Sequence, residues 1–196
     1  MIPFVFFLYG LCIGSFLNVV IYRVPLELSV VKGRSRCPAC GHTLGPFDLV
    51  PLFSFLFLGG KCRYCKAPIS PRYPLVEAVT GALFALCALA WGLSWYAVVL
   101  CLYGSVLIAA AFIDREHGII PDRLHVVILL LAAASWFAGP TVTLMDRLIG
   151  ALGLGAAMLL VSLFTGGGIG GGDIKLLAAS GLLLGWKLTV PAFFLA

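Results

Sequence analysis

The N-terminal stretch MIPFVFFLYGLCIGSFLNVVIYR, residues 1–23, is an apolar run that closes on a single arginine. No basic residue precedes the run, and it is longer than the apolar core of a secretory signal peptide, which spans roughly 7 to 15 residues. A helix of about 20 residues crosses the hydrocarbon core of a bilayer. We therefore predict that residues 1–22 form a retained first transmembrane helix.

The rest of the chain has the same apolar character. Of its 196 residues, 62% are hydrophobic and 11% are charged, and the mean hydropathy is +1.11, which excludes an ordinary soluble globular protein. Further apolar runs lie near residues 74–91, 96–113, 124–138, 147–164 and 174–190. The pattern predicts an all-α polytopic membrane protein with about six or more transmembrane helices, in which residues 74–196 form a multi-span domain.

A polar insert, residues 23–73, separates the first apolar run from the second. It holds eight of the thirteen lysine and arginine residues and two acidic residues, which gives it a net charge of +6. The positive-inside rule places such a segment in the cytoplasm, and its charge would attract anionic lipid. Counting crossings from the insert puts the loop 114–122 and the glycine run 166–172 on the cytoplasmic face, with the turns 92–95 and 139–146 opposite.

Two CxxC pairs in the insert, CPAC and CRYC, have the spacing C-x2-C-x21-C-x2-C. This spacing is close to that of structural zinc sites, so we expect one structural Zn²⁺ held by Cys37, Cys40, Cys62 and Cys65. The insert would then be a small zinc-ribbon-like domain whose folding depends on the metal. Disulfides or a redox CxxC are the alternatives, which a reducing cytoplasm disfavours, and His42 is a possible substitute ligand.

Acidic residues mark the ends of two later apolar runs, Asp114 in FIDREHGIIPD and Asp173 in GGGIGGGDIK. Two carboxylates held close together share one proton, and the pair then supplies an acid and a base for activating water on a peptide carbonyl. Glycines before Asp173 would let the backbone approach an extended substrate closely. In the alternative interpretation, Asp173 is a helix N-cap and Asp114 an interfacial residue paired with Arg115.

Four motifs in order carry a family resemblance: GSFLNVVIYRVP, the CxxC insert closed by GGKCRYCKAPISPRYPLVE, IDREHGIIPD, and GGGDIKLLAASGLLLGW. Together they resemble the type IV prepilin peptidases, which are similar to other GxGD-type aspartic membrane proteases, and they cover residues 14–186. The resemblance implies that Asp114 and Asp173 are the catalytic pair of the domain 74–196. It gives a supporting role to Asp122, Gly170, Gly172 and Lys175.

The resemblance also implies two activities. The family cleaves the short leader of prepilins and pseudopilins at the cytoplasmic face of the inner membrane, in type IV pilus assembly and protein secretion. It then methylates the new N-terminal amine with S-adenosylmethionine. We expect prepilins or pseudopilins and the lipid bilayer as partners, and no nucleic acid. Asn18, Arg23 and Glu77 are the methylation candidates; for Asn18 and Glu77, interhelical hydrogen bonding is the alternative.

Two other functions stay open at the level of sequence. A leader peptidase without methyltransferase activity would resemble this chain only in its aspartate motifs. A non-enzymatic membrane adaptor that displays a zinc insert would give no reason for two aspartates at matching depth. Family members usually continue into one or two further spans, whereas this chain stops in LTVPAFFLA within an apolar run, so we expect a chain truncated at its C-terminus.

Overall fold

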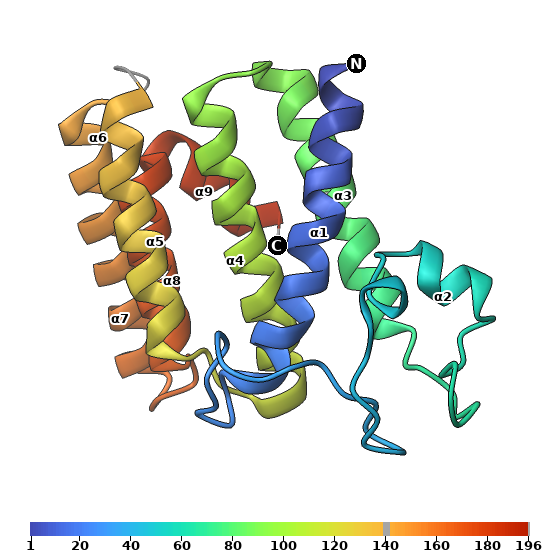
Figure 1. The fold of residues 1–196 in the computed structure, drawn as a ribbon. Coiled ribbons are helices and arrows are strands. Elements are labelled where there is room, and N and C mark those ends of the chain that lie inside the picture. Colours follow the sequence, from blue (N-terminus) through green and yellow to red (C-terminus); the bar gives the residue numbers. More distant parts are fainter. Residues whose placement is uncertain (139–141, 196) are drawn as a thin grey trace. The chain divides into compact units, whose positions relative to one another are not determined.

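The computed structural model describes residues 1–138 and 142–195, which form helices and loops without a β-strand. In chain order the helices are α1 (Ile2–Arg23), α2 (Phe53–Phe57), α3 (Arg72–Trp91), α4 (Trp95–His117), α5 (Asp122–Ala134), α6 (Leu144–Leu148), α7 (Leu154–Phe164), α8 (Gly171–Leu184) and α9 (Trp186–Leu195) (Figure 1). A π-helical turn, Ile149–Gly153, joins α6 to α7. The insert carries one 3-10 turn, Pro46–Asp48, and a second 3-10 turn, Ser135–Ala138, follows α5.

Four helices in the described part of the chain are long and apolar enough to cross a membrane: α1, α3, α4 and the continuous helix Leu144–Phe164. The chain is therefore a mostly helical membrane protein. The sequence predicted six or more such helices, but two of the predicted spans, near residues 124–138 and 174–190, form helices too short to cross a membrane. α5 has 13 residues because it passes into a 3-10 turn at Ser135, and α8 has 14 because it ends at Gly185, whose φ of 74° stops a helix.

Two compact units make up the chain, and each is described by itself. The first comprises Met1–Leu93 and Leu107–His117, and the second comprises Ser94–Val106 and Gly118–Ala196, so α4 contributes to both. The division into domains 1–22, 23–73 and 74–196 stays a prediction. The turn expected at 139–146 lies partly outside the described residues.

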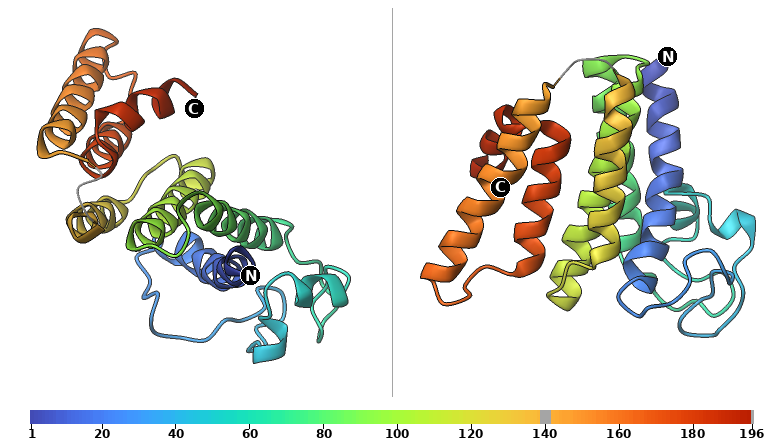
Figure 2. Two further views of the ribbon diagram at one scale, coloured as in Figure 1. Left: turned by 90° about the horizontal axis from the view of Figure 1, so that it is seen from above. Right: turned by 90° about the vertical axis from the view of Figure 1, so that its left-hand side faces the viewer.

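The first unit is built on close packing of α1 against α3, which lie side by side (Figures 1 and 2). Buried residues recur every three or four positions on α1 and include Gly10 and Gly14. A Cβ atom at Gly10 would lie 2.8 Å from the Cα of Gly81, and one at Gly14 would lie 2.7 Å from the Cα of Glu77. Glycine is thus required at these positions, as in other membrane helix pairs that pack through small residues.

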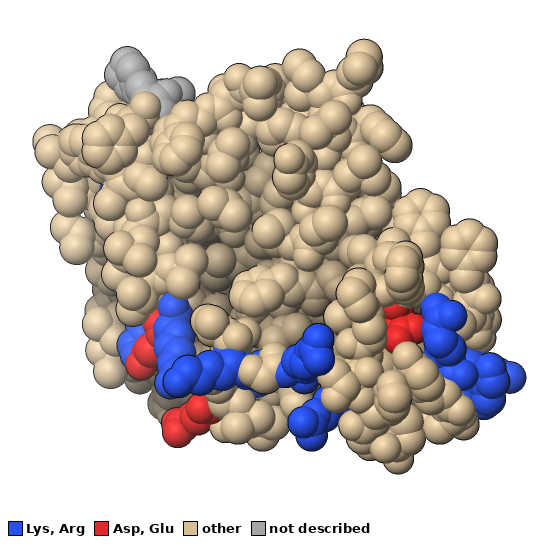
Figure 3. Space-filling view, viewed as in Figure 1, with Lys and Arg blue, Asp and Glu red and all other residues tan. Residues whose placement is uncertain are grey.

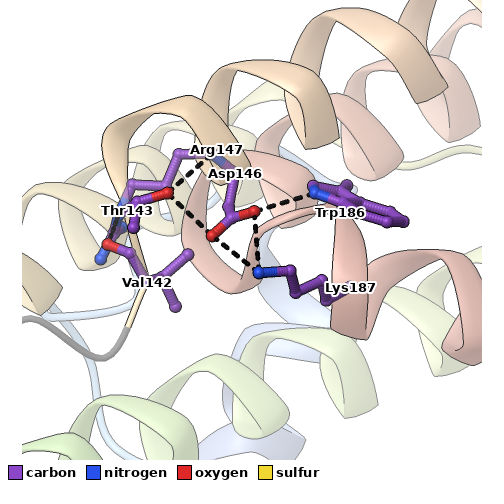
Figure 4. Close-up of polar contacts among 6 residues, drawn as sticks. All are labelled: Val142, Thr143, Asp146, Arg147, Trp186 and Lys187. Atoms are coloured by element: carbon purple, nitrogen blue, oxygen red, sulfur yellow. Dashed lines mark hydrogen bonds and ion pairs between the residues drawn. The ribbon is translucent and has the colours of Figure 1, made fainter.

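Polar contacts in the second unit join α6 to the start of α9 (Figure 4). The Asp146 carboxylate accepts a hydrogen bond of 2.9 Å from the Trp186 indole and forms an ion pair of 3.3 Å with Lys187. Next to it, the Arg147 side chain is buried and donates to the Ser135 hydroxyl at 2.7 Å. Arg147 also donates to carbonyls at the end of α8, where a cation is favourable. The buried charge is therefore satisfied by the helix ends around it.

We predict that Gly14→Ala lowers the stability of the detergent-solubilised protein by about 1–3 kcal/mol, because its Cβ would meet the α3 backbone. The thermal unfolding midpoint measures this effect. Gly153→Ala is the matched control, since the nearest atom to its Cβ would lie 4.0 Å away. Equal midpoints for the two variants would contradict the account of α1–α3 packing.

Candidate functional site

The four insert cysteines gather into one cluster. The Sγ atoms of Cys37, Cys40, Cys62 and Cys65 all lie within 4.8 Å of one another, and the sulfurs of Cys37 and Cys65 are 3.8 Å apart. A regular tetrahedron with metal–sulfur bonds of about 2.3 Å has edges of about 3.8 Å, whereas a disulfide bond measures about 2.05 Å. The cysteines are free thiols, so the geometry fits a tetrahedral metal and not disulfides. His42 stacks on Tyr64 instead, with ring centroids 3.6 Å apart.

Two similar turns present these sulfurs. In the first, the amide of Gly41 donates to the Cys37 carbonyl at 2.9 Å, and in the second the amide of Lys66 donates to the Cys62 carbonyl at 3.0 Å. Gly41 and Lys66 occupy equivalent positions and both have positive φ, 70° and 61°. The repeated CxxC sequence therefore folds twice into the same tight turn.

The thiols of the cluster differ in how readily they lose a proton. Backbone N–H groups of Cys40 and Ala39 lower the pKa of Cys37 to about 7. At Cys65 the backbone N–H of Ala67 acts to lower the pKa, but burial and the neighbouring thiols outweigh it and raise the pKa to about 11. Cys37 therefore ionises more readily than a free thiol and Cys65 less readily, because burial and hydrogen bonds with the other thiols favour the protonated form of Cys65. A divalent cation would offset that preference.

The three methylation candidates make contacts that hold the insert and the first helix pair. Asn18 donates to the Tyr73 carbonyl of α3 at 3.2 Å. Glu77 accepts the backbone N–H of Leu52 at 2.8 Å, and Leu52 has a positive φ of 61°. The bond of Asn18 joins two helices, as the structural alternative expects, whereas the bond of Glu77 joins α3 to the insert. A role in methylation stays a prediction.

Arg23, at the end of α1, closes the loop that starts the insert. Its guanidinium donates to the carbonyls of Ser29 at 2.9 Å and Lys32 at 2.7 Å. These bonds fix the first turn of the insert to the end of the first membrane helix.

Charged side chains lie over the insert and the helix ends on the face shown in Figure 3, and uncharged side chains cover the helix bodies. Among the described residues, five of the eight acidic side chains form a hydrogen bond or an ion pair, and the other three are Glu27, Asp114 and Asp173. Asp114 lies in the last turns of α4, in the first unit, and Asp173 in the first turn of α8, in the second. Both side chains are exposed to solvent.

The N-cap of α8 is Gly170, and Asp173 is the third residue of the helix. The alternative that Asp173 is the N-cap is therefore wrong. Its carboxylate lies beside Gly170, since a Cβ there would be 3.1 Å from Oδ2 of Asp173. The glycine thus leaves room for the acidic side chain.

His125 on α5 is a site residue that the sequence did not reveal. It is buried, and its Nε2 lies 3.0 Å from the carbonyl oxygen of Gly172 in the GxGD sequence. A Cβ at Gly172 would lie 3.2 Å from the Cβ of Ile120, so the glycine also permits close contact with the loop before α5. His125 therefore positions the residue next to Asp173.

A salt bridge makes a second link between the starts of α5 and α8. Lys175 Nζ lies 2.7 Å from Oδ1 of Asp122. This hydrogen bond and the lysine charge lower the pKa of Asp122, which keeps it ionised in neutral solution. A carboxylate held in this form suits a supporting residue better than a partner that shares a proton.

The fold and these sites define a polytopic membrane protein with a tetracysteine insert and paired aspartate motifs. The family model "Bacterial Peptidase A24 N-terminal domain" matches residues 8–91, and the model "Type IV leader peptidase family" matches residues 101–196. The chain belongs to the type IV leader peptidase family. No solved structure matches it.

Three relatives are each named "Prepilin leader peptidase/N-methyltransferase". The one from Bacillus subtilis is 39% identical over 97% of this chain and 77% of the relative. The Myxococcus xanthus relative is 40% identical over 97% of this chain, and the chain spans 58% of its length. The Pseudomonas aeruginosa relative is 38% identical over 92% of this chain and 72% of its own length.

We predict that His125→Leu speeds hydrogen exchange of the backbone amides in the glycine run 166–172 by about tenfold, because one hydrogen bond of about 1.4 kcal/mol is lost. His125→Gln is the control, since its side-chain amide can donate to the same carbonyl. If His125→Leu left exchange in the glycine run unchanged, the positioning role would be wrong.

Proposed function

We propose that this chain is an aspartic endopeptidase of the inner membrane that cleaves the leader of prepilins or pseudopilins and methylates the new N-terminus. The observation that carries the proposal is that Asp114 and Asp173 are exposed at helix ends, and neither carboxylate forms a hydrogen bond or an ion pair within residues 1–138 and 142–195. The three relatives, whose names state both activities, support it. In this proposal the aspartates and the basic insert face the cytoplasm.

Cleavage of a peptide bond is promoted by a base that activates water and an acid that donates a proton to the carbonyl oxygen. When Asp114 and Asp173 meet, like charge prevents both from ionising, so one keeps a proton. The ionised carboxylate removes a proton from water, whose oxygen bonds to the carbonyl carbon, while the protonated one donates to the carbonyl oxygen. The carbon–nitrogen bond then breaks, and the amine leaves with a proton. Gly170 leaves room for the Asp173 carboxylate, Gly172 lets α8 approach the loop before α5, and Asp122 with Lys175 holds α8 against α5.

Methylation follows on the amine that cleavage releases. S-adenosylmethionine, when bound, supplies a methyl group on a sulfonium sulfur. The chain must hold the amine in its neutral form, since only the free lone pair attacks carbon. The names of the relatives include both a leader peptidase and an N-methyltransferase activity, which favours a bifunctional enzyme over a peptidase alone.

The cysteine cluster is proposed to hold one structural Zn²⁺. The sulfur spacing suits tetrahedral thiolate ligands, and four of them leave no coordination position for water. The metal would fold the insert, which buries little apolar surface of its own, and would take no part in hydrolysis.

Asp114→Asn and Asp173→Asn should each lower leader cleavage at least about 100-fold, because either change removes half of a proton-sharing pair. Gel analysis of a leader-bearing prepilin measures the rate. Asp146→Asn is the matched control, since that residue lies in the Trp186 and Lys187 contacts, and Asp122→Asn should keep measurable activity. Cleavage at the wild-type rate by Asp114→Asn or by Asp173→Asn would contradict the assignment of these two residues as the catalytic pair.

Replacement of Cys37, Cys40, Cys62 or Cys65 by Ser should reduce bound zinc from one atom per chain and speed proteolysis of the insert. Elemental analysis and limited proteolysis measure the two effects. Cys12→Ser is the control, because Cys12 lies on α1 outside the cluster. A wild-type protein that contains no zinc after purification without chelators would refute the metal site.

A further inference from the structure

A pocket of about 500 Å³ lies in the first unit between the first turn of α3 and the last turns of α4. Arg72, Arg115 and Glu116 form its charged lining, and Pro71, Leu75 and Phe112 form its apolar lining. Its mixture of apolar walls with a few charged groups is typical of small-molecule sites. Neither the candidate aspartates nor the cysteine cluster lines it.

The charged groups of this pocket do not fully satisfy one another. Nη1 of Arg72 lies 2.6 Å from both carboxylate oxygens of Glu116. The Nε–H of Arg72 is buried and has no acceptor in the described structure. Arg115 is exposed, and no hydrogen bond or ion pair involves it among residues 1–138 and 142–195. The Arg72 Nε–H therefore lacks an acceptor and Arg115 lacks an anion among the described residues. An ion pair that served only to join two helices would not need these additional groups.

The two sides of the pocket also differ in electrostatic potential. Its α3 side is the N-terminal end of a 20-residue helix, where partial positive charge favours an anion. Its α4 side is the C-terminal end of a 23-residue helix, where partial negative charge favours a cation, and Glu116 adds a full negative charge there. A ligand that carries a carboxylate and an ammonium group on neighbouring atoms matches both sides.

We propose that this pocket binds the amino-acid end of S-adenosylmethionine, which rests on the methyltransferase half of the proposed function. The α-carboxylate would bind the exposed guanidinium of Arg115, and the α-ammonium would bind Glu116. Phe112, Leu75 and Pro71 supply apolar surface for the adenosine. The contacts of Asn18, Arg23 and Glu77 with the helix pair and the insert leave this pocket as the stronger candidate for the methyl donor.

The position of the pocket in the sequence relates leader cleavage to methylation. Asp114 lies between Phe112 and Arg115 on α4, so the residue proposed to act in cleavage is next in sequence to the lining of the pocket. The amine lone pair forms the new carbon–nitrogen bond, the carbon–sulfur bond electrons return to sulfur, and the amine proton leaves to solvent. The products are the N-methylated chain and S-adenosylhomocysteine.

Binding of S-adenosylhomocysteine and of methylthioadenosine, measured by equilibrium dialysis on the full chain in detergent, tests the site. Methylthioadenosine lacks the amino-acid end. Arg115→Gln and Glu116→Gln should each weaken S-adenosylhomocysteine binding about tenfold, equivalent to 1.4 kcal/mol, and leave methylthioadenosine binding unchanged. Arg123→Gln is the matched control, since this exposed arginine does not line the pocket and should alter neither.

Three results would overturn the pocket assignment. Unchanged S-adenosylhomocysteine binding in both variants would place the amino-acid end elsewhere. An equal loss of affinity for both ligands would show that the variants disturb the fold and that the pocket does not recognise the amino-acid end. If the wild-type protein bound neither ligand while it cleaved prepilin, the methyltransferase half of the proposed function would fail together with the pocket. Failure of cleavage alone, with ligand binding as expected, would contradict only the peptidase half.

Discussion

A charged side chain within a bilayer costs several kcal/mol unless it reaches water or a polar partner, and this cost accounts for where the charged groups of the membrane helices lie. Asp114 and Arg72 lie in end turns of membrane-spanning helices, and Asp173 lies in the first turn of α8. Glu77 and Arg147 are buried, and each has polar partners, a backbone N–H in one case and a hydroxyl and carbonyls in the other. The aspartates proposed to act in cleavage therefore lie at helix ends, where water can reach them.

The same constraint explains how a hydrophilic insert is attached to membrane helices. Glycines bring α1 and α3 so close that Asn18 reaches the backbone of α3. Glu77, on the next turn of α3, then holds Leu52 of the insert, and Arg23 closes the insert's first loop. The insert thus begins and ends on one tightly packed helix pair, and the proposed zinc would stabilise the part that lies beyond these contacts.

Local sequence predicted the features that depend on local geometry. CxxC spacing predicted the sulfur cluster, since each pair folds into the same short turn, and long apolar runs predicted α1, α3 and α4. Helix ends within apolar sequence were harder to predict. The 3-10 turn at Ser135 and Gly185 end helices at positions where the sequence remains apolar. His125 and the Arg72–Glu116 pair were missed because each contact joins residues more than 40 positions apart without a repeating pattern.

The central claim is that one chain performs hydrolysis and then methyl transfer on the same substrate end. Intact mass measurement of a leader-bearing prepilin, incubated with the purified protein in the presence and absence of S-adenosylmethionine, tests it most directly. The account predicts loss of the leader in both reactions and the gain of a single methyl group on the mature chain only when the methyl donor is present. An uncleaved substrate in both reactions, or a methyl group on the uncleaved precursor, would contradict the account.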